Sequence, residues 1–501
     1  MGKNRIALFL LLLVFIHGVM IMTATGYEEE AEEEYVWGSE GEGEQWGRGE
    51  EGEEEWGGGG GEKGRFLMRE SRQVIRTEAG DMRVVLSPRG RIIEKPMHIG
   101  FLTMEPQSLF VPQYLDSSLL IFVRRGEARL GVMCEDEFGE KRLKAGDIYW
   151  IPAGSVFYLV NTGIGQRLHV ICSIDPADSL GLETFQSFYI GGGAHPPSIL
   201  SGFDIDTLAT AFNVSGAELR QMLTGQVGGP IVHIAGGERA PALWTKFLEL
   251  RDEEKHMHLK RISGMSRESS SGYRETEEHS GWMSWRKLLR SMLSREGTNR
   301  KTRCEDSYNI YDRKPDFRND YGWSIALDSA DYRPLKHSGI SVYLVILNAG
   351  SMMAPHMNPT ATEYGVVLSG AGDIEVVLPN GKLAMKRRVA EGDVFWIPRY
   401  FAFCQIASRT GPFKFFGFTT SARRNRPQFF VGSNSLLRSL NIPELAAAFG
   451  VDNDTMRRFV GAQGEAVILP TAGAAPPDVT EKKAKTSKVA KKVIDGVMGL
   501  F

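Results

Sequence analysis

The chemistry that this sequence could perform is concentrated in one stretch, Gly350–Gly370, which contains His356 and Glu363. Imidazole and carboxylate groups bind divalent transition metals, and copper or zinc would be the metals to expect. Structural metal sites usually have four protein ligands and catalytic sites three. Between His356 and Glu363 the sequence has Asn358, which is not a usual metal ligand. Two ligands alone predict weak metal binding at most. The simpler interpretation is a hydrogen-bonded pair, with no cofactor required.

Cysteine chemistry is a weaker candidate in the same region, because Cys404 could approach His356 and Glu363. The cysteines form no CxxC or similar spacing, so a thiolate zinc site is not predicted. Four cysteines allow three disulfide pairings, and the sequence selects none of them. The four are Cys134, Cys172, Cys304 and Cys404. No Ser/His/Asp or Cys/His arrangement for nucleophilic catalysis can be assembled either, which predicts that the chain is not an enzyme.

Length and charge restrict the class of protein. The 501 residues suffice for two or three domains, and a net charge of −3 favours neither nucleic acid nor an acidic partner. Residues 1–26 contain Lys3, Arg5 and a short apolar run, a pattern typical of a secretory signal peptide. An uncleaved membrane anchor is the alternative. No later stretch approaches a spanning length, so we expect no membrane association after cleavage.

Three segments lack the apolar periodicity of folded elements. Residues 27–64 are almost entirely Glu and Gly and predict a disordered acidic extension. Residues 236–305 are polar and charged and predict a flexible linker whose histidines hold no ordered metal. Residues 471–501 form a Lys-rich tail that ends in VIDGVMGLF. Its basic run predicts a solvated surface, because no aromatic residues interleave with it as in a nucleic-acid site.

Two parts of the chain repeat each other. GDIYWIPAG at Gly146–Gly154 returns as GDVFWIPRY at Gly392–Tyr400, and LATAF at Leu208–Phe212 returns as LAAAF at Leu445–Phe449. Landmarks in the same order at a nearly constant offset indicate that a whole domain has been duplicated.

Each copy, at 65–235 and 306–470, is predicted to be a jelly-roll β-barrel followed by short α-helices. The predicted strands are short, rich in β-branched and aromatic residues, and bounded by Gly, Pro or Asp. In the second copy they are Ser341–Leu347, Tyr364–Leu368, Asp373–Leu378, Val394–Ile397 and Phe413–Phe418. LPNG at Leu378–Gly381 predicts a tight hairpin. The helices could pack on their own barrel or on a neighbouring subunit, and the fold class is all-β with helical arms.

The second copy resembles the cupin family. Its first motif follows the spacing G-x5-H-x-H-x4-E-x6-G from Gly350 to Gly370, with Asn358 in place of the second histidine. Gly392 and Pro398 resemble the opening of the other cupin motif. The whole arrangement, with blocks such as SFYIGGGAHPPSILSGF and PQFFVG, is similar to the vicilin-type seed storage globulins.

This resemblance implies a bicupin storage protein, a nutrient reservoir of seeds that assembles as a homotrimer. It implies passage through the secretory pathway to the protein storage vacuole, with secretion from the cell as the alternative. A vacuolar sorting receptor that reads the apolar C-terminus would be a further partner. The alternative function is a metal- or small-ligand-binding cupin that uses the second barrel around His356 and Glu363.

The resemblance also implies where metal ligands would lie, because metal-using cupins place four inside each barrel. The first copy has Gln113, Leu115, Leu119 and Phe157 at these positions. This barrel is therefore expected to be free of metal. In the second copy Asn358 and Phe403 take two of the four positions. Cys404 is one residue away from the last position, so it would face the other side of its strand unless a bulge intervened.

Two N-glycosylation sequons follow the repeated LATAF and LAAAF segments. They are Asn213-Val214-Ser215 and Asn453-Asp454-Thr455. In a chain that enters the secretory pathway, Asn213 and Asn453 are candidate acceptors.

Overall fold

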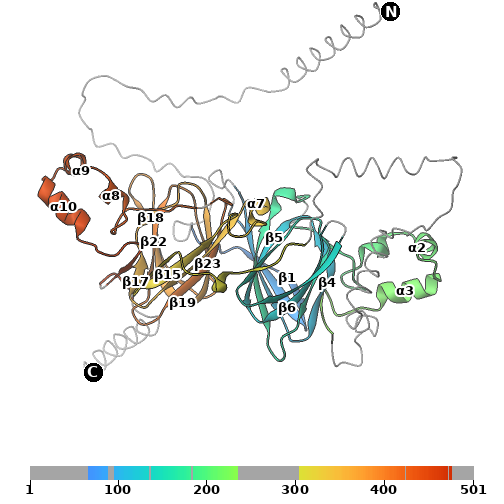
Figure 1. The fold of residues 1–501 in the computed structure, drawn as a ribbon. Coiled ribbons are helices and arrows are strands. Elements are labelled where there is room, and N and C mark those ends of the chain that lie inside the picture. The colour runs from blue at the N-terminus through green and yellow to red at the C-terminus, as the bar shows by residue number, and fades with distance from the viewer. Residues whose placement is uncertain are drawn as a thin grey trace, which may run out of the picture. The chain divides into compact units, whose positions relative to one another are not determined.

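A computed structural model describes most of the chain between the predicted extension and the predicted tail. The described residues are 66–88, 95–134, 137–181, 184–234, 304–423, 425–471 and 473–476. They form two β-barrels, each followed by short helices (Figure 1), which confirms the predicted fold class. Residues 1–26 and 27–64 lie outside this part, as does nearly all of 236–305 and 471–501. No helix of the described residues is long and apolar enough to cross a membrane.

The first barrel consists of two antiparallel sheets. β10 (Leu168–Asp175) lies inside the larger sheet, between β3 (His98–Met104) and β5 (Ser118–Arg125). Its side chains are buried along almost the whole strand, as the continuous apolar run LHVICSID predicts. The other strands are β1 (Ser71–Thr77), β2 (Gly80–Val85), β4 (Ser108–Leu115), β6 (Glu127–Cys134), β7 (Glu137–Lys144), β8 (Asp147–Ile151), β9 (Phe157–Asn161), β11 (Ser187–Tyr189) and β12 (Ile231–His233).

The second barrel is organised around one long strand, β19 (Glu363–Val377). Its first half pairs with β21 (Val394–Ile397) and β23 (Phe413–Thr419), and its second half pairs with β20 (Leu383–Ala390) and β22 (Ala402–Ala407). The register of β19 shifts between Val367 and Ser369, and this irregularity lets the single strand pair with different neighbours along its two halves. The remaining strands are β14 (Phe317–Asn319), β15 (Gly322–Leu327), β16 (Ser341–Leu347), β17 (Ser351–Met353), β18 (His356–Met357), β24 (Gln428–Phe429) and β25 (Ile468–Pro470).

The hairpin predicted from LPNG joins β19 to β20. The Gly381 N–H donates to the Leu378 carbonyl at 2.9 Å, and Gly381 has a φ of +79°. A residue with a side chain would be strained in this left-handed conformation, whereas glycine adopts it readily. The predicted turn is confirmed.

Each barrel takes an edge segment from the other half of the chain. Leu67, which precedes the first barrel, forms an antiparallel bridge with Phe395 in β21 of the second barrel. Beside it, the Trp396 N–H donates to the Phe66 carbonyl at 3.0 Å. In return, β13 (Tyr308–Asn309) pairs with β8 of the first barrel, although it follows the predicted linker. β8 and β21 belong to the repeated GD-x-x-W-I-P segments, so the exchange is reciprocal.

One apolar core continues from the first barrel into the second. The rings of Phe122 in β5 and Phe416 in β23 stack with centroids 4.0 Å apart, and both are fully buried. Lys95 adds a polar link, since its Nζ pairs with Asp175 at 2.8 Å and donates to the Ser338 carbonyl at 2.9 Å. Ser338 ends the short helix α7 (Leu335–Ser338) in the second half of the chain. The two barrels are therefore joined by burial of apolar surface as well as by the chain.

The helices after each barrel bury their apolar faces against one another. They are α2 (Ile205–Phe212), α3 (Gly216–Thr224), α8 (Leu436–Ser439), α9 (Ile442–Phe449) and α10 (Asn453–Gly461). Leu208, Leu219 and Leu223 form one small cluster that is separate from the barrel cores. Leu445 and Met456 contribute to an equivalent cluster in the second arm. Self-contained arms of this kind leave other apolar side chains exposed.

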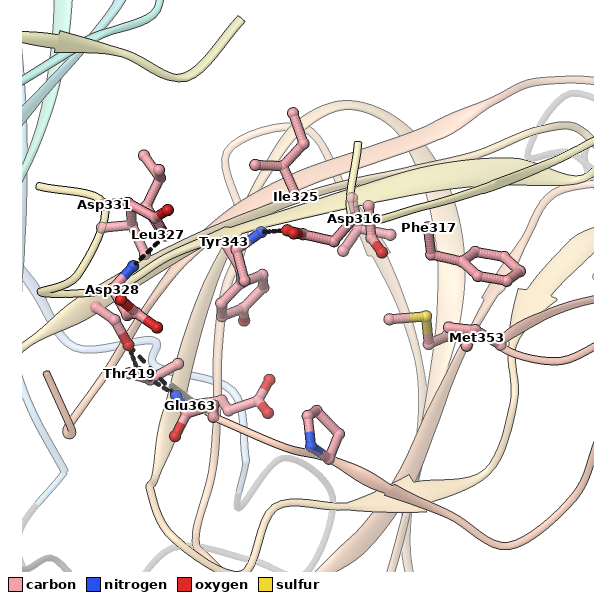
Figure 2. A pocket seen from close by; sticks show the side chains of 18 of the residues that line it. Asp316, Phe317, Ile325, Leu327, Asp328, Asp331, Tyr343, Met353, Glu363 and Thr419 are labelled. Carbon is pink, nitrogen blue, oxygen red and sulfur yellow. Dashed lines mark hydrogen bonds between the residues drawn. The ribbon is translucent and has the colours of Figure 1, made fainter. Parts of the chain in front are cut away.

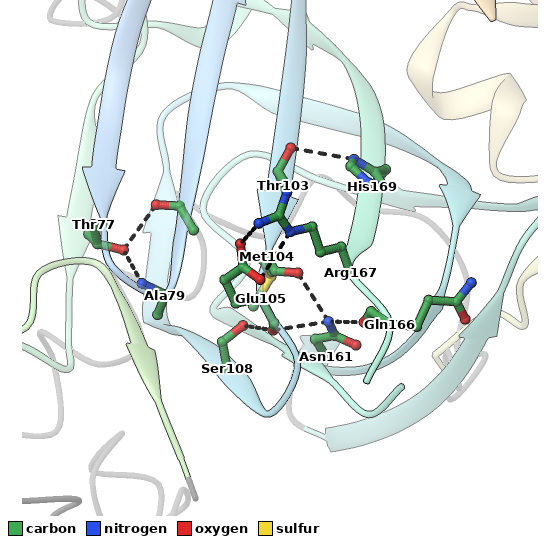
Figure 3. Close-up of polar contacts among 11 residues, drawn as sticks. Thr77, Ala79, Thr103, Met104, Glu105, Ser108, Asn161, Gln166, Arg167 and His169 are labelled. Atoms are coloured by element: carbon green, nitrogen blue, oxygen red, sulfur yellow. Dashed lines mark hydrogen bonds and ion pairs between the residues drawn. The ribbon is translucent and has the colours of Figure 1, made fainter. Parts of the chain in front are cut away.

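A polar network closes one end of the first barrel (Figure 3). The Nδ2 of Asn161 donates to the carbonyls of Met104, Glu105 and Gln166, at 3.1, 3.0 and 2.9 Å. Its Oδ1 accepts from the Gly163 N–H at 2.9 Å. The buried amide thus ties the loop after β3 to the loop after β9. Because its partners are backbone groups, its role is to hold the two loops together.

A disulfide between Cys134 and Cys304 decides the pairing that the sequence left open. The two Cα atoms are 5.4 Å apart, and Cys134 ends β6 of the first barrel. Cys304 lies at the end of the predicted linker, just before β13. Cys172 and Cys404 are unpaired and buried. The disulfide therefore links the parts of the chain that lie before and after residues 251–303. The sequence of this segment is rich in Lys and Arg.

Cleavage within residues 251–303 is expected to leave the two halves of the chain covalently joined. Brief trypsin treatment should give two large fragments on a reducing denaturing gel and one joined species without reductant. Cys304→Ser is the matched control, and its fragments should separate on the denaturing gel in either case. Separation of the wild-type fragments without reductant would contradict the Cys134–Cys304 pairing.

Candidate functional site

The chemistry predicted around His356 lies against a cavity of about 610 Å³ in the second barrel. β15, β16 and β23 contribute walls, and β18, β19 and β22 each contribute a polar residue. Figure 2 shows Tyr343 and Glu363 pointing into the same space, with Met353 and Phe317 to one side. The cavity therefore combines an apolar interior with a few polar groups, as ligand pockets commonly do.

His356 is held as a neutral ring in an aromatic setting. The register of β18 against β22 places it opposite Phe403, and their ring centroids are 4.1 Å apart. Phe429 lies 5.1 Å away on the neighbouring strand. The Nδ1 of His356 lies 2.7 Å from the Ala354 carbonyl. Burial lowers the pKa of His356 to about 4, so the ring is neutral at neutral pH. Because a carbonyl oxygen can only accept a hydrogen bond, the single ring proton lies on Nδ1 and is donated to Ala354.

Glu363 begins β19 and is almost completely buried. Burial raises the pKa of its carboxyl group to about 7, although the Asn358 amide and the nearby Tyr343 hydroxyl favour the ionised form. The Nδ2 of Asn358 donates to Glu363 at 3.2 Å. The Tyr343 hydroxyl makes no hydrogen bond of ordinary geometry. The partner of Glu363 is thus Asn358, whereas His356 bonds to the backbone.

Asn358, which takes the place of the second histidine of the cupin motif, has a structural role in the turn before β19. Its Oδ1 accepts from the backbone N–H groups of Thr360 and Ala361, at 3.0 and 3.2 Å. Its other side-chain atom donates to Glu363, so one amide both forms the turn before β19 and binds the carboxylate. The signal was present as Asn-Pro-Thr, a turn-forming sequence. An imidazole could not make all of these bonds.

Cys404 does not join His356 and Glu363. It lies opposite Glu375 in the pairing of β19 with β22, which shows no register irregularity there. Its neighbours Phe403 and Gln405 project to the other face, toward His356 and the cavity. Burial, and then the charge of Glu375, raise the pKa of the Cys404 thiol to about 12. The thiol is therefore protonated at neutral pH, and its place in the strand directs it away from His356 and Glu363.

The residues present do not fit a copper or zinc ion. Within the described residues, no three His, Cys, Asp or Glu side chains come together as a group that could hold a metal. His356 has an aromatic ring, that of Phe403, where a further ligand would be needed. Two donors fall short of the three or four that bound zinc usually has.

We expect protein purified without chelators to carry well under one copper or zinc ion per chain, because only two candidate ligands are present. Elemental analysis after mild dialysis measures this ratio. His356→Ala is the matched variant, and it should keep both its fold and the same low metal content. A ratio near one in the native protein that falls in the variant would show a metal site at His356.

Among the described residues of the first barrel, the positions that correspond to cupin metal ligands are occupied by other side chains. Leu115, Leu119 and Phe157 are buried apolar side chains, and Phe157 makes an edge contact with Phe110 at 6.3 Å. Gln113 is fully buried, and neither atom of its side-chain amide has a hydrogen-bond partner. None of these side chains is a usual metal ligand. The four positions at which a metal-using cupin would have its ligands are therefore buried in the interior of this barrel.

Both sequon asparagines lie exposed in the arms. Asn213 is the C-cap of α2 and adopts a left-handed conformation with a φ of +53°, as asparagine often does there. Asn453 is the first residue of α10 and is likewise exposed. Both side chains are accessible in the described chain.

Two cavity residues carry no sequence signal. Tyr343 lies in SVYLVIL and Gln405 in FAFCQIA, and each resembles an ordinary strand residue. The Tyr343 hydroxyl and the Gln405 Oε1 are nevertheless buried without a hydrogen-bond partner. Only the folding of β16 against the rest of the barrel brings them to the same cavity as Glu363.

Comparison with known sequences gives one consistent result. The cupin family model matches residues 96–220 and 308–457. A vicilin-like seed storage protein of Arabidopsis thaliana is 63% identical over 516 aligned residues, which cover 96% of this chain and 99% of that protein. A second vicilin-like seed storage protein of the same plant is 29% identical. The alignment with it covers 81% of this chain and 53% of that protein.

Solved structures agree at the level of the fold. The vicilin of Corylus avellana aligns with a TM-score of 0.63 at 21% identity, over 82% of this chain and 99% of that one. A vicilin of Solanum melongena, described as having different anionic ligands in structurally similar pockets, aligns with a TM-score of 0.63 at 20% identity. It covers 81% of this chain and 97% of its own.

Proposed function

This chain belongs to the vicilin-like seed storage proteins of the cupin family, and from that premise we propose that it is a nutrient reservoir without enzymatic activity. The observation that carries the proposal is the 63% identity to a vicilin-like seed storage protein over nearly the full length of both chains. The second barrel supports it, since His356 is neutral and bonded to the backbone. Glu363 is likewise held by the Asn358 amide.

If the protein is a nutrient reservoir, its amount should follow the development of the seed. An antibody raised against it should detect accumulation during seed filling and loss during germination. Immunogold labelling of the same seeds tests the proposed route through the secretory pathway, with the signal in storage vacuoles. Labelling of the cell exterior would favour secretion, and a constant low amount through germination would contradict storage. A sorting receptor for the tail is part of the same proposal.

We also propose glycans at Asn213 and Asn453, because both are exposed sequon residues. Enzymatic removal of N-glycans from protein purified from seeds should lower its mass. An unchanged mass would contradict the proposal.

Assembly as a homotrimer is proposed from the arms. Phe449 and Phe459 are 62% and 68% exposed, at the ends of α9 and α10. Large apolar side chains that remain exposed on a subunit are typical of surfaces that contact a partner. The two similar halves of the chain give it two similar ends, so contacts between the arms of neighbouring subunits can close a ring.

Light scattering of the purified protein is expected to give about three chains per particle. The double variant Phe449→Asp, Phe459→Asp should give single chains, because charges would be buried in the contact. Ile164→Asp is the control, since Ile164 is 98% exposed and lies in a loop of the first barrel. A wild-type monomer at micromolar concentration would contradict the proposal.

A second function, small-molecule binding in the second barrel, is favoured by one specific observation. The cavity of about 610 Å³ is lined by Tyr343 and Gln405, and each has a buried polar atom that makes no hydrogen bond of ordinary geometry. The vicilin of Solanum melongena, which has a related fold, is described as having ligands in its pockets, and this supports small-molecule binding by the fold. Those ligands are anionic, whereas most charged residues that line this cavity are acidic. Storage and ligand binding are compatible in one chain.

A further inference from the structure

We propose that the cavity of the second barrel selects an uncharged amphipathic molecule, with a compact apolar body and an O–H donor of the phenol class, over anions. This inference rests on the small-molecule site proposed above and is independent of storage. It names the chemical class that the residues around Tyr343, Glu363 and Gln405 would recognise.

The size and walls of the cavity fit a small apolar body. Its volume of about 610 Å³ is within the usual range for drug-sized ligands. Leu327, Val345, Met353 and Phe415 line it, and each is buried in the barrel. An apolar ring placed against these side chains would lose contact with water on most of its surface, which stabilises the complex.

Two buried polar atoms that line the cavity have unused hydrogen-bonding capacity. Gln405 is 1% exposed, and its Oε1 has no hydrogen-bond partner. Tyr343 is 9% exposed, and its hydroxyl lies near Glu363 without a hydrogen bond of ordinary geometry. Native proteins rarely leave such buried groups unpaired, because each unmade bond costs free energy. A ligand hydroxyl can donate to the Gln405 carbonyl or to the Glu363 carboxyl group and accept from Tyr343.

The charges around the cavity disfavour an anion. Glu363 lines it and is buried, and the other acidic residues of the lining, Asp316, Asp328 and Asp331, are more exposed. Arg313 is engaged by two of these, Asp316 at 2.7 Å and Asp331. A ligand carboxylate would therefore share a poorly hydrated space with Glu363, and two like charges there repel strongly. Arg423 is another cation of the lining, but it is exposed. An uncharged ligand avoids this repulsion.

A matched pair of probes tests the charge preference. Isothermal titration calorimetry at pH 7.5 compares 4-ethylphenol, which is uncharged, with 4-ethylbenzoate, which is an anion of similar shape. We expect the full-length protein to bind the phenol at least tenfold more tightly. Equal or tighter binding of the benzoate would overturn the inference while leaving a small-molecule site in place. Binding of neither probe would overturn both, and the storage proposal is tested separately in seeds.

Variants locate the binding. Tyr343→Phe and Gln405→Met each remove one polar group with little change of volume, and each should weaken phenol binding about tenfold. Gln113→Met is the control, because Gln113 is also a buried amide without partners but lies in the first barrel. Two independent variants keep the test valid if one fails to fold. Unchanged affinity in the folded variants, or an equal loss in Gln113→Met, would overturn the assignment to this cavity.

Discussion

Replacing Phe66 by alanine is expected to lower the free energy of unfolding by about 3–5 kcal/mol, as for other large aromatic residues removed from a core. Phe66 is 0% exposed, and its ring packs against Trp396 and Phe401, with centroids 5.7 and 5.6 Å away. It precedes the first barrel in sequence and packs in the second. The loss should therefore affect both barrels, because it weakens the segment that crosses from one to the other.

Urea denaturation, followed by fluorescence and by circular dichroism, measures the effect. Both signals should show one transition at a lower midpoint, since the core is continuous between the barrels. Phe203→Ala is the matched control, because Phe203 is 59% exposed. It should change the free energy of unfolding by less than about 0.5 kcal/mol, as surface substitutions usually do. Equal effects of the two substitutions would contradict the placement of Phe66.

The second large effect is a dependence of stability on pH that arises from Glu363. Burial raises its pKa from the ordinary 4.5 to about 7. A raised pKa in the folded state means that the stability contributed by this carboxyl group is fully present below pH 4.5. It is lost as the pH rises through 7. The loss is on the order of 3 kcal/mol, since one pKa unit corresponds to about 1.4 kcal/mol.

Glu363→Gln removes this titration while keeping the shape of the side chain. The difference in the free energy of unfolding, variant minus wild type, should rise by on the order of 3 kcal/mol between pH 4 and pH 8. Urea titrations at several pH values measure it. A difference that does not change with pH would contradict a pKa of Glu363 that burial raises in the folded state.

His356→Gln is the matched comparison, because it should show the opposite slope. Burial lowers the pKa of His356 from 6.5 to about 4. The stability from its neutral ring is thus present above pH 6.5 and is lost as the pH falls through 4. The variant should gain on the wild type in acid, by an amount on the order of 3 kcal/mol. Slopes of the same sign in the two variants would show that these groups do not titrate as described.

Local sequence alone determined the repeated elements of the fold. β-Branched and aromatic runs bounded by Gly, Pro or Asp marked many strands of the two barrels, because such residues fit an extended, half-buried surface. Two predicted strands, Tyr364–Leu368 and Asp373–Leu378, fall in the single strand β19, which ends at Val377. Asn380-Gly381 marked the hairpin between β19 and β20, because its turn needs a positive φ. The spacing from Gly350 to Gly370 likewise identified the cupin motif, and the near-constant offset between copies identified the duplication. Apart from that offset, these signals lie within a few residues of the structure that they predict.

Tertiary structure alone decided the features that join distant parts of the chain. Phe66 packs in the second barrel and Tyr308 pairs in the first, although neither segment carries a signal for crossing. Cys134 pairs with Cys304, 170 residues away, although spacing allowed three arrangements. Tyr343 and Gln405 meet Glu363 only because three strands curve around one cavity. Side-chain partners at this distance depend on the packing of the whole barrel, which no local pattern encodes.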